Sequence, residues 1–249
     1  RIYSCSVVLG LTALYCMVKA LEEDRFRYWA GMVAALAVMM YGHFVTIWII
    51  FAFNCYFLCT LLVDRRRFWK WVAANLALMA LIAPALYLAW EMNKIVLGLK
   101  FEWYPNPTLK TGLITFKTFF AGYGPSAWAY WPLFLMAAAA FALGLLALHR
   151  RWTAAALLLI LTFVPIVGNV FLWSYRHFSF YEHRLFIFSG VVAILAVAWG
   201  MRSLKKPVLT LAALAVFAAF TLPCLADYYR HRLHPIEMHR LAVWDKVDF

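Results

Sequence analysis

The sequence predicts an all-α integral membrane protein, a polytopic helical bundle of about eight spans, from three observations. Hydrophobic residues make up 66% of the 249 residues and charged residues only 14%, whereas an ordinary soluble domain carries about 25% charged residues. The apolar residues form long runs, and short clusters of Arg and Lys separate them. Most runs have the roughly 20 residues that a helix needs to cross a hydrocarbon core of about 30 Å.

Eight runs follow one another, and we expect each to be a helix, because a helix satisfies its own backbone in lipid. The runs cover residues 4–21, 28–42, 44–63, 71–90, 131–149, 153–175, 185–201 and 207–226. Residues 28–63 carry no formal charge and would extend about 54 Å as one helix. We therefore predict a tight turn at Gly42 and His43; a single kinked helix would invert the topology upstream. Residues 1–226 form the predicted transmembrane domain, and residues 227–249 form an outward-facing tail.

The basic composition indicates membrane anchoring rather than nucleic-acid binding. The net charge is +12 and the pI is about 9.7, but the basic residues lie at the ends of apolar runs, where cytoplasmic anchors and headgroup contacts are expected. The five cysteines lie inside the runs. Cys55 and Cys59 share a helix face without a His or carboxylate, which favours packing over a metal site or a disulfide.

The distribution of Arg and Lys predicts the orientation. Residues 22–27, 64–70, 150–152 and 202–206 carry 11 basic residues in 21 positions, whereas the alternate set carries 10 in 73. The alternate set contains His43, residues 91–130, residues 176–184 and the tail. Because loops dense in Lys and Arg stay in the cytoplasm, we expect the alternate set to face outward, into the periplasm of a bacterium or a eukaryotic lumen.

The longest outward loop, residues 91–130, contains a predicted amphipathic helix over residues 108–120. Four apolar residues share its predicted face at i, i+4, i+7 and i+11: Leu109, Leu113, Phe116 and Phe120. Lys110 and Lys117 lie seven residues apart on an adjacent face, which is typical of a helix in the membrane interface. Two interpretations remain: the helix covers the bundle, or its lysines attract a lipid phosphate.

A second outward loop reads R-H-F-S-F-Y-E-H-R over residues 176–184, directly before an apolar run. Arg184 is the predicted phosphate ligand, because the guanidinium donates two hydrogen bonds at once; a snorkelling anchor is the alternative. Tyr181, Glu182 and His183 complete the predicted substrate-binding cluster, although a carboxylate beside two arginines is more often in a structural ion pair. His43, at the outward turn, either ends a helix or lines the same site.

Four segments resemble the family 39-type membrane glycosyltransferases of the GT-C group, which include protein O-mannosyltransferases and the aminoarabinose transferase of lipid A. They are R-I-Y-S at residues 1–4, Y-G-H-F at 41–44, E-W-Y-P at 102–105 with the following helix, and H-R-L-F at 183–186. In this resemblance Arg184 matches a basic position presented to the donor phosphate, and His43 matches more loosely. Leu185 stands where an aromatic residue, commonly Tyr, is expected.

The resemblance implies a transferase that moves a sugar from a polyprenyl-phosphate donor to a lipid, glycan or protein acceptor on the outer face of a membrane, such as the bacterial inner membrane. It also implies catalytic carboxylates in a loop upstream of Arg1. We therefore expect this segment alone to be inactive and the catalytic residues to lie outside it. We assign no metal ligand and no certain cofactor here. The resemblance is to a metal-variable group, which leaves open whether the full-length protein uses a divalent metal. Membrane lipids are the other expected partner.

Two other classes remain open. A transporter or lipid-linked-sugar flippase shows internal repeats and polar or broken-helix positions at mid-membrane. The sequence has no convincing repeat, but Pro84 and Pro165 lie inside apolar runs and are candidate breaks. A structural membrane subunit is the third class, and it predicts that the outward cluster tolerates substitution.

Overall fold

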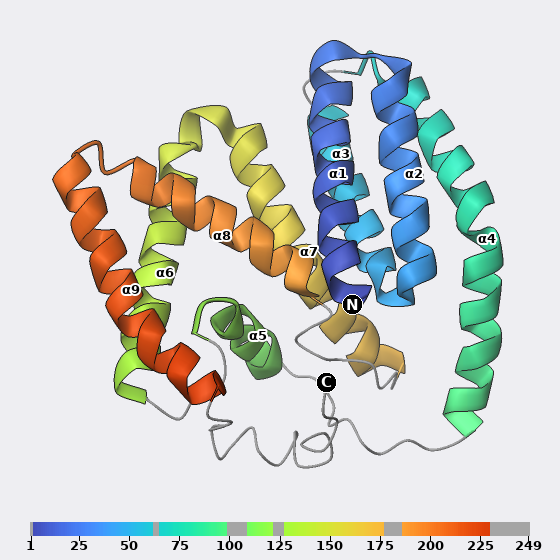
Figure 1. The fold of residues 1–249 in the computed structure, drawn as a ribbon. Coiled ribbons are helices and arrows are strands. Elements are labelled where there is room, and N and C mark those ends of the chain that lie inside the picture. The colour runs from blue at the N-terminus through green and yellow to red at the C-terminus, as the bar shows by residue number, and fades with distance from the viewer. Residues whose placement is uncertain (1, 62–64, 99–108, 122–126, 177–185, 230–249) are drawn as a thin grey trace. The chain divides into compact units, whose positions relative to one another are not determined.

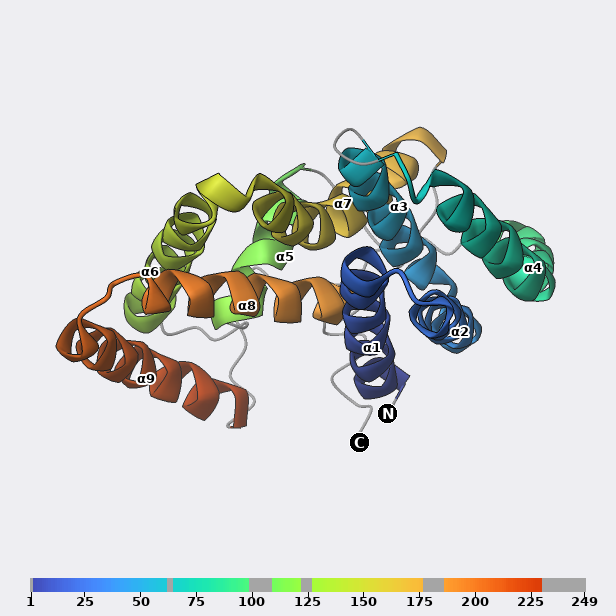
Figure 2. The same ribbon diagram turned by 90° about the horizontal axis from the view of Figure 1, so that it is seen from above.

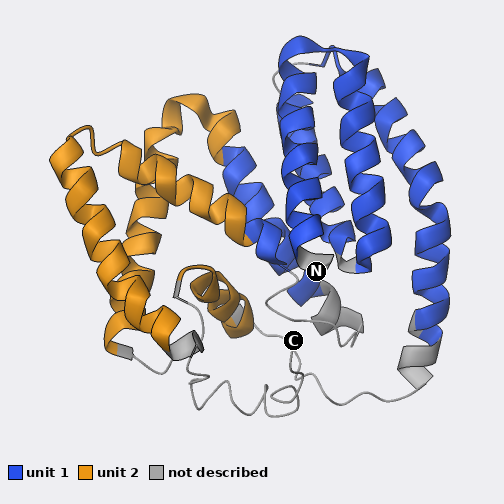
Figure 3. Cartoon of the chain, in the orientation of Figure 1, with its two compact units in different colours: residues 1–109, 156–189 blue, residues 110–155, 190–249 orange. Residues whose placement is uncertain are grey.

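The structure is a computed structural model that describes residues 2–61, 65–98, 109–121, 127–176 and 186–229. Every element in this part of the chain is a helix (Figure 1), so the predicted all-α class is confirmed. The chain divides into two compact units, which are described separately (Figure 3). Unit 1 holds residues 1–109 and 156–189, and unit 2 holds residues 110–155 and 190–249.

Five of the described helices are long and apolar enough to cross a membrane. They are Ser4–Glu23, Phe68–Met92, Trp128–Ala147, His149–Phe171 and Pro207–Ala226. The helices at the other three predicted spans have only 15 to 17 residues, and at about 1.5 Å per residue each measures about 22–26 Å. An integral membrane protein is therefore supported, whereas the count of eight spans is not confirmed and stays a prediction.

Large apolar side chains cover the outside of the candidate spans, as expected for surfaces that face lipid. Leu76, Leu135, Phe171 and Leu211 are all exposed, and none of the residues in the Pro207–Ala226 span is buried. In water such a continuous apolar surface would be an interaction or aggregation site, whereas in a bilayer it is the normal contact with acyl chains.

In unit 1, α1 (Ile2–Glu23) and α2 (Phe26–Gly42) lie side by side (Figures 1 and 2). The turn between them uses Asp24, whose φ of 53° is in the left-handed region, and Asp is among the few residues that tolerate this conformation. The Asp24 N–H donates to the carbonyl of Ala20 at 3.1 Å, which caps the end of α1. Buried Ala13, Met17 and Ala20 of α1 contribute to the core of this unit.

The predicted turn at Gly42 and His43 is confirmed. Helix α2 ends at Gly42, the short 3-10 helix η1 (Phe44–Thr46) follows, and α3 (Ile47–Leu61) begins directly after it. Within the next helix, α4 (Phe68–Gly98), Pro84 leaves the helix unbroken. The Tyr41 hydroxyl donates to the Leu81 carbonyl at 2.9 Å, three residues before that proline, which ties α2 to α4 where the proline weakens the hydrogen bonds within the helix.

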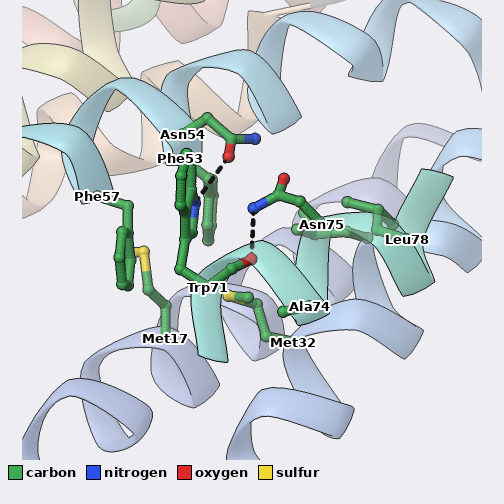
Figure 4. A pocket seen from close by; sticks show the side chains of 10 residues that line it. Met17, Met32, Phe53, Asn54, Phe57, Trp71, Ala74, Asn75 and Leu78 are labelled. Carbon is green, nitrogen blue, oxygen red and sulfur yellow. Dashed lines mark hydrogen bonds between the residues drawn. The ribbon is translucent and has the colours of Figure 1, made fainter. Parts of the chain in front are cut away.

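Aromatic stacking and amide hydrogen bonds join α3 to α4. The rings of Phe57 and Trp71 are parallel to within 5°, with centroids 5.4 Å apart. The Trp71 indole N–H donates to the Asn54 side-chain carbonyl at 2.9 Å, and the Asn75 amide donates to the Trp71 backbone carbonyl at 2.9 Å (Figure 4). The Asn54 amide in turn donates to the Ile50 carbonyl at 2.9 Å, so both asparagines have partners from helix backbones or Trp71.

Unit 2 contains α5 (Leu109–Ala121), α6 (Ala127–Ala147), α9 (Pro207–Tyr229) and most of α8 (Ile187–Arg202). Helix α7 (Trp152–Arg176) begins in unit 2 after the 3-10 helix η2 (His149–Arg151) and lies mainly in unit 1. Buried Tyr130 and Leu133 of α6 pack against α9, contacting Phe217, Phe220 and Cys224.

Helices α6 and α8 approach closely enough for their backbones to touch. A Cβ atom on Gly144 would overlap the Ala196 carbonyl oxygen, and one on Gly200 would overlap the Ala140 carbonyl oxygen. Ala140 and Gly144 are four residues apart, and so are Ala196 and Gly200. Each helix therefore presents two small residues on one face, which is the arrangement that lets membrane helices pack most closely.

Candidate functional site

The helix α5 lies outside the five candidate spans and carries two of the predicted site lysines. Thr111, Thr115 and Phe116 are its buried residues, at 4%, 0% and 9% exposure, whereas Leu113 is 63% exposed. The predicted apolar face is therefore wrong at Leu113. Threonine can replace leucine in the buried face because its hydroxyl bonds within the helix: Thr115 Oγ1 donates to the Thr111 carbonyl at 3.0 Å.

Aromatic contacts attach α5 to its neighbours in unit 2. Phe116 makes edge-to-face contacts with Phe134 and Phe141 of α6, with centroids 6.2 and 5.5 Å apart. On α8, Gly190 leaves room for the Phe119 ring, because an added Cβ would lie 2.9 Å from its Cδ1 atom. Such edge-to-face pairs contribute about 0.5–1.5 kcal/mol beyond the area they bury. α5 is thus a packed element of the bundle, which supports the first of the two predicted interpretations.

The two lysines of α5 have different surroundings. Lys117 Nζ lies 4.1 Å from the centroid of the Tyr130 ring and 5.4 Å from that of Trp131, so two ring faces of α6 attract its charge. Lys110, near the start of α5, is exposed. Both lysines were predicted to attract a lipid phosphate. Lys110 is exposed, whereas Lys117 contacts two aromatic rings of α6 and so joins α5 to α6.

His43 has a structural part in the turn between α2 and α3. Its backbone N–H donates to the Met39 carbonyl at 3.2 Å, and its own carbonyl accepts from the Thr46 N–H at 3.0 Å and from Thr46 Oγ1 at 2.7 Å. The imidazole stacks on the Phe44 ring with centroids 5.2 Å apart. The half-buried ring therefore belongs to a well-bonded helix end, which is the first of its two predicted roles.

The four residues of the predicted cluster Tyr181, Glu182, His183 and Arg184 lie outside the described residues, as does the whole segment 177–185. The chain on either side is placed. α7 ends at Arg176, and Phe186, two residues after Arg184, is 1% exposed. Phe188 is fully buried in unit 1 against Gly10 and Phe53. Of the other three predicted site residues, His43 belongs to unit 1 and both lysines belong to unit 2.

An ionic cluster at the α1–α2 turn was not predicted as a site. Lys70 Nζ lies 2.6 Å from Asp24 Oδ2, and Arg25 Nε lies 3.3 Å from Glu23 Oε2. The hydrogen bond from Lys70 lowers the pKa of the Asp24 carboxyl below its usual value, and the Trp29 indole and the charge of Arg67 act in the same direction. The pair places residues 22–27 and 65–70 at one end of unit 1, as the alternation of loops predicts.

The described residues offer little polar space inside unit 1. The cavity beside Asn54, Trp71 and Asn75 has a volume of about 20 Å³, enough for about one water molecule. Within the described ranges, no three His, Cys, Asp or Glu side chains gather as a metal site would require. Comparisons with protein-family models, with curated proteins and with solved structures gave no match to this chain.

Proposed function

We propose that the protein is a membrane glycosyltransferase of the GT-C type, which takes a sugar from a polyprenyl-phosphate donor on the outer face of its membrane. The observation that carries the proposal is α5, a short helix outside the candidate spans, packed on α6 and exposing Lys110. The sequence resemblance described above points to the same activity. Eight spans, an outward α5 and a bacterial inner membrane are parts of this proposal.

The surroundings of α5 suit a lipid-linked substrate. Trp128 and Trp131, at the start of α6, are exposed, and such aromatic residues concentrate where the hydrocarbon meets the headgroups. Lys117 contacts the same Trp131 ring, so α5 is held at the level of these aromatic residues. A cation at that depth attracts the phosphate of a polyprenyl-phosphate sugar, and a site partly shielded from water strengthens the attraction.

Glycosyl transfer needs a base for the acceptor hydroxyl and a group that stabilises the departing phosphate. In this proposal Arg184 and Lys110 are the candidate phosphate ligands, and Tyr181, Glu182, His183 and His43 keep the substrate-binding roles that the sequence predicts for them. The proposal assigns no catalytic carboxylate and no metal ligand to the residues of this chain. The acceptor is a lipid, a glycan or a protein.

The described helices favour a transferase over a transporter or flippase. Transporter sites lie where membrane helices are interrupted at mid-membrane. Here α4, α6, α7 and α9 each contain a proline and run on without interruption. The amides of Asn54 and Asn75 bond to helix carbonyls, beside a cavity that holds about one water. These features describe a packed bundle rather than a transport path.

Substitution of Arg184 tests the proposal. The measurement is donor-dependent sugar transfer in membranes that contain the whole protein at matched levels. Arg184→Ala is expected to lower turnover roughly ten- to a hundredfold, because a charge-assisted phosphate contact contributes about 1.5–3 kcal/mol. Arg184→Lys keeps the charge without the planar fork and is expected to retain part of the activity. Arg176→Ala, at the end of α7, is the matched control and is expected to cost much less.

An Arg184→Ala variant as active as the parent would contradict the phosphate role. A variant whose protein level collapses would indicate that Arg184 anchors the helix end. Transport of a polyprenyl-phosphate sugar across vesicles, without any transfer of the sugar, would instead support the flippase.

A further inference from the structure

We infer that a groove between α2 and α4 binds one acyl chain of an anionic phospholipid, with the lipid phosphate beside Lys70. The groove lies within unit 1 and has a volume of about 420 Å³, within the range of about 300–1,000 Å³ that is typical of small-molecule sites. Its lining is apolar except at Lys70. The lining residues are Phe26, Trp29, Ala30, Val33, Ala34 and, on α4, Lys70, Ala73, Ala74, Ala77 and Leu81.

The groove exists because both helices carry alanine where they face it. Ala30 and Ala34 are four residues apart on α2, as are Ala73 and Ala77 on α4, so each pair lies on one helix face. These four alanines are exposed, although α2 and α4 contact one another. The helices therefore touch through other residues and leave an open channel between the alanine faces.

The length and direction of the groove match an acyl chain. Its lining on α4 runs from Lys70 to Leu81, and the eleven helical rises between them at 1.5 Å each give about 16 Å. One leaflet supplies half of the roughly 30 Å hydrocarbon core. The groove is therefore about as long as one leaflet is thick. Its walls are apolar and a lysine lies at one end, so its dimensions match a single lipid tail.

The charge at the Lys70 end favours an anionic headgroup. Residues 19–27 and 64–70 together carry seven basic and four acidic side chains. Lys70 donates one hydrogen bond to Asp24, but an ammonium has three donors and this side chain is 52% exposed. A phosphate accepts from a remaining donor, as basic pockets between membrane helices accept acidic lipids.

Exposed aromatic residues mark the depth of this end. Phe26 is 85% exposed and lines the groove, and Trp69, the neighbour of Lys70, is 76% exposed. Tryptophan is enriched at the boundary between acyl chains and headgroups. The phosphate of a lipid whose tail fills the groove would therefore lie at the depth of Lys70. This site is separate from the sugar-transfer site of the proposed function.

Photolabelling tests the inference. The protein is placed in vesicles of phosphatidylcholine that contain phosphatidylglycerol with a photoreactive group in its acyl chain, and the labelled peptides are mapped by mass spectrometry. Labelling is expected on the peptides that carry Ala34 and Ala77, and unlabelled phosphatidylglycerol is expected to compete better than phosphatidylcholine. Ala77→Leu fills the groove and is expected to remove most of this label. Ala80→Leu, on an exposed part of α4 that does not line the groove, is expected to leave it unchanged.

A charge variant separates the headgroup from the tail. The variant is Lys70→Gln, which removes the cation and leaves the partly exposed Asp24 carboxylate in place. It is expected to reduce the preference for phosphatidylglycerol about fivefold, since one basic residue near the surface contributes about 1 kcal/mol, while the tail is still labelled. Asp24→Asn, which keeps the cation, is the control and is expected not to weaken the preference. Unfolding temperatures of all variants show that the fold is retained.

Three results would overturn the inference. Equal competition by phosphatidylcholine would show contact with bulk lipid only. Labelling that survives Ala77→Leu in folded protein would place the lipid elsewhere. A dimer that Ala77→Leu dissociates, with no lipid label, would make the groove an interface with a second copy of the chain.

Discussion

Lys117 of α5 holds its ammonium 4.1 Å from the centroid of the Tyr130 ring of α6. The ring is 3% exposed, so the charge lies against a buried aromatic face rather than in open solvent. The pair joins the short helix to the candidate span and fixes one of two lysines that the sequence alone presents as equivalent. This difference separates the stabilising contact of Lys117 from the binding role proposed for Lys110.

Lys117→Met and Lys110→Met are therefore expected to fail in different ways. Lys117→Met removes the cation from the two rings and should lower the free energy of unfolding by about 0.5–2 kcal/mol, whereas Lys117→Arg, which keeps a cation, should stay near the parent. Lys110→Met should leave stability unchanged and weaken donor binding by about fivefold, the value of one interfacial cation. Thermal unfolding in detergent and the apparent KM for the lipid-linked donor measure the two effects. Equal behaviour of both methionine variants would contradict the assignment.

The Asp24–Lys70 pair predicts a stability that depends on pH. The pKa of Asp24 is lowered in the folded protein, so its contribution is fully present above the unfolded value of about 3.9. The contribution is lost as the pH falls through the folded pKa. The pair is substantially exposed, with side-chain exposures of 40% for Asp24 and 52% for Lys70, which limits its contribution to about 1 kcal/mol or less.

Asp24→Asn is the variant that checks this dependence. At neutral pH its unfolding temperature should lie slightly below that of the parent, and the two should converge as the pH falls below about 4, where the parent carboxylate becomes protonated. Glu22→Gln is the control, because Glu22 does not pair with Lys70. A difference between parent and Asp24→Asn that is constant at every pH would show that the carboxylate charge contributes nothing.

The sequence predicts helices well here because apolar runs and charged breaks are local signals. The turn after Gly42 could be predicted from helix length alone, and α2 ends at that residue in the structure. The buried face of α5 is not local, because it depends on where α6 and α8 lie. Periodicity selected Leu113, whereas the helix buries Thr115, whose hydroxyl is satisfied by its own helix.

Two contacts that the sequence did not predict are also not local. The contact of Lys117 with Tyr130 joins residues 13 positions apart on two helices, and the pair of Lys70 with Asp24 joins residues 46 positions apart. No spacing rule reaches across such distances. One signal did exist for the second pair: the two loops belong to the same predicted side of the membrane, so their charges were expected to lie at one end.

The density of basic residues predicts the side of each loop, and cysteine labelling measures it. In a variant without the five native cysteines, a cysteine at position 66 is expected to be closed to an impermeant reagent added outside, and one at position 106 is expected to react. After permeabilisation both should react, which controls for local accessibility. Labelling at position 66 and not at 106 in intact cells would reverse the orientation, and with it the face on which α5 and the proposed transfer site lie.

The last prediction concerns the close approach of α6 and α8. Alanine ordinarily stabilises a helix interior by up to about 1 kcal/mol relative to glycine. At Gly144 and Gly200, however, the new methyl would meet the backbone carbonyls of Ala196 and Ala140, and a backbone cannot rotate away as a side chain does. Gly144→Ala and Gly200→Ala should therefore each lower the free energy of unfolding by about 1–3 kcal/mol, the usual cost of overpacking.

Gly31→Ala is the matched control for the two substitutions. Gly31 also lies inside a helix, but its added Cβ would contact only the side chain of Cys16, with the Sγ atom at 2.9 Å, and that side chain can move. The free energy of unfolding of Gly31→Ala should therefore change little or rise slightly. Unfolding temperatures of the three variants, purified in the same detergent, give the comparison. If Gly144→Ala and Gly200→Ala were as stable as Gly31→Ala, the close approach of the α6 and α8 backbones at these two glycines would be contradicted.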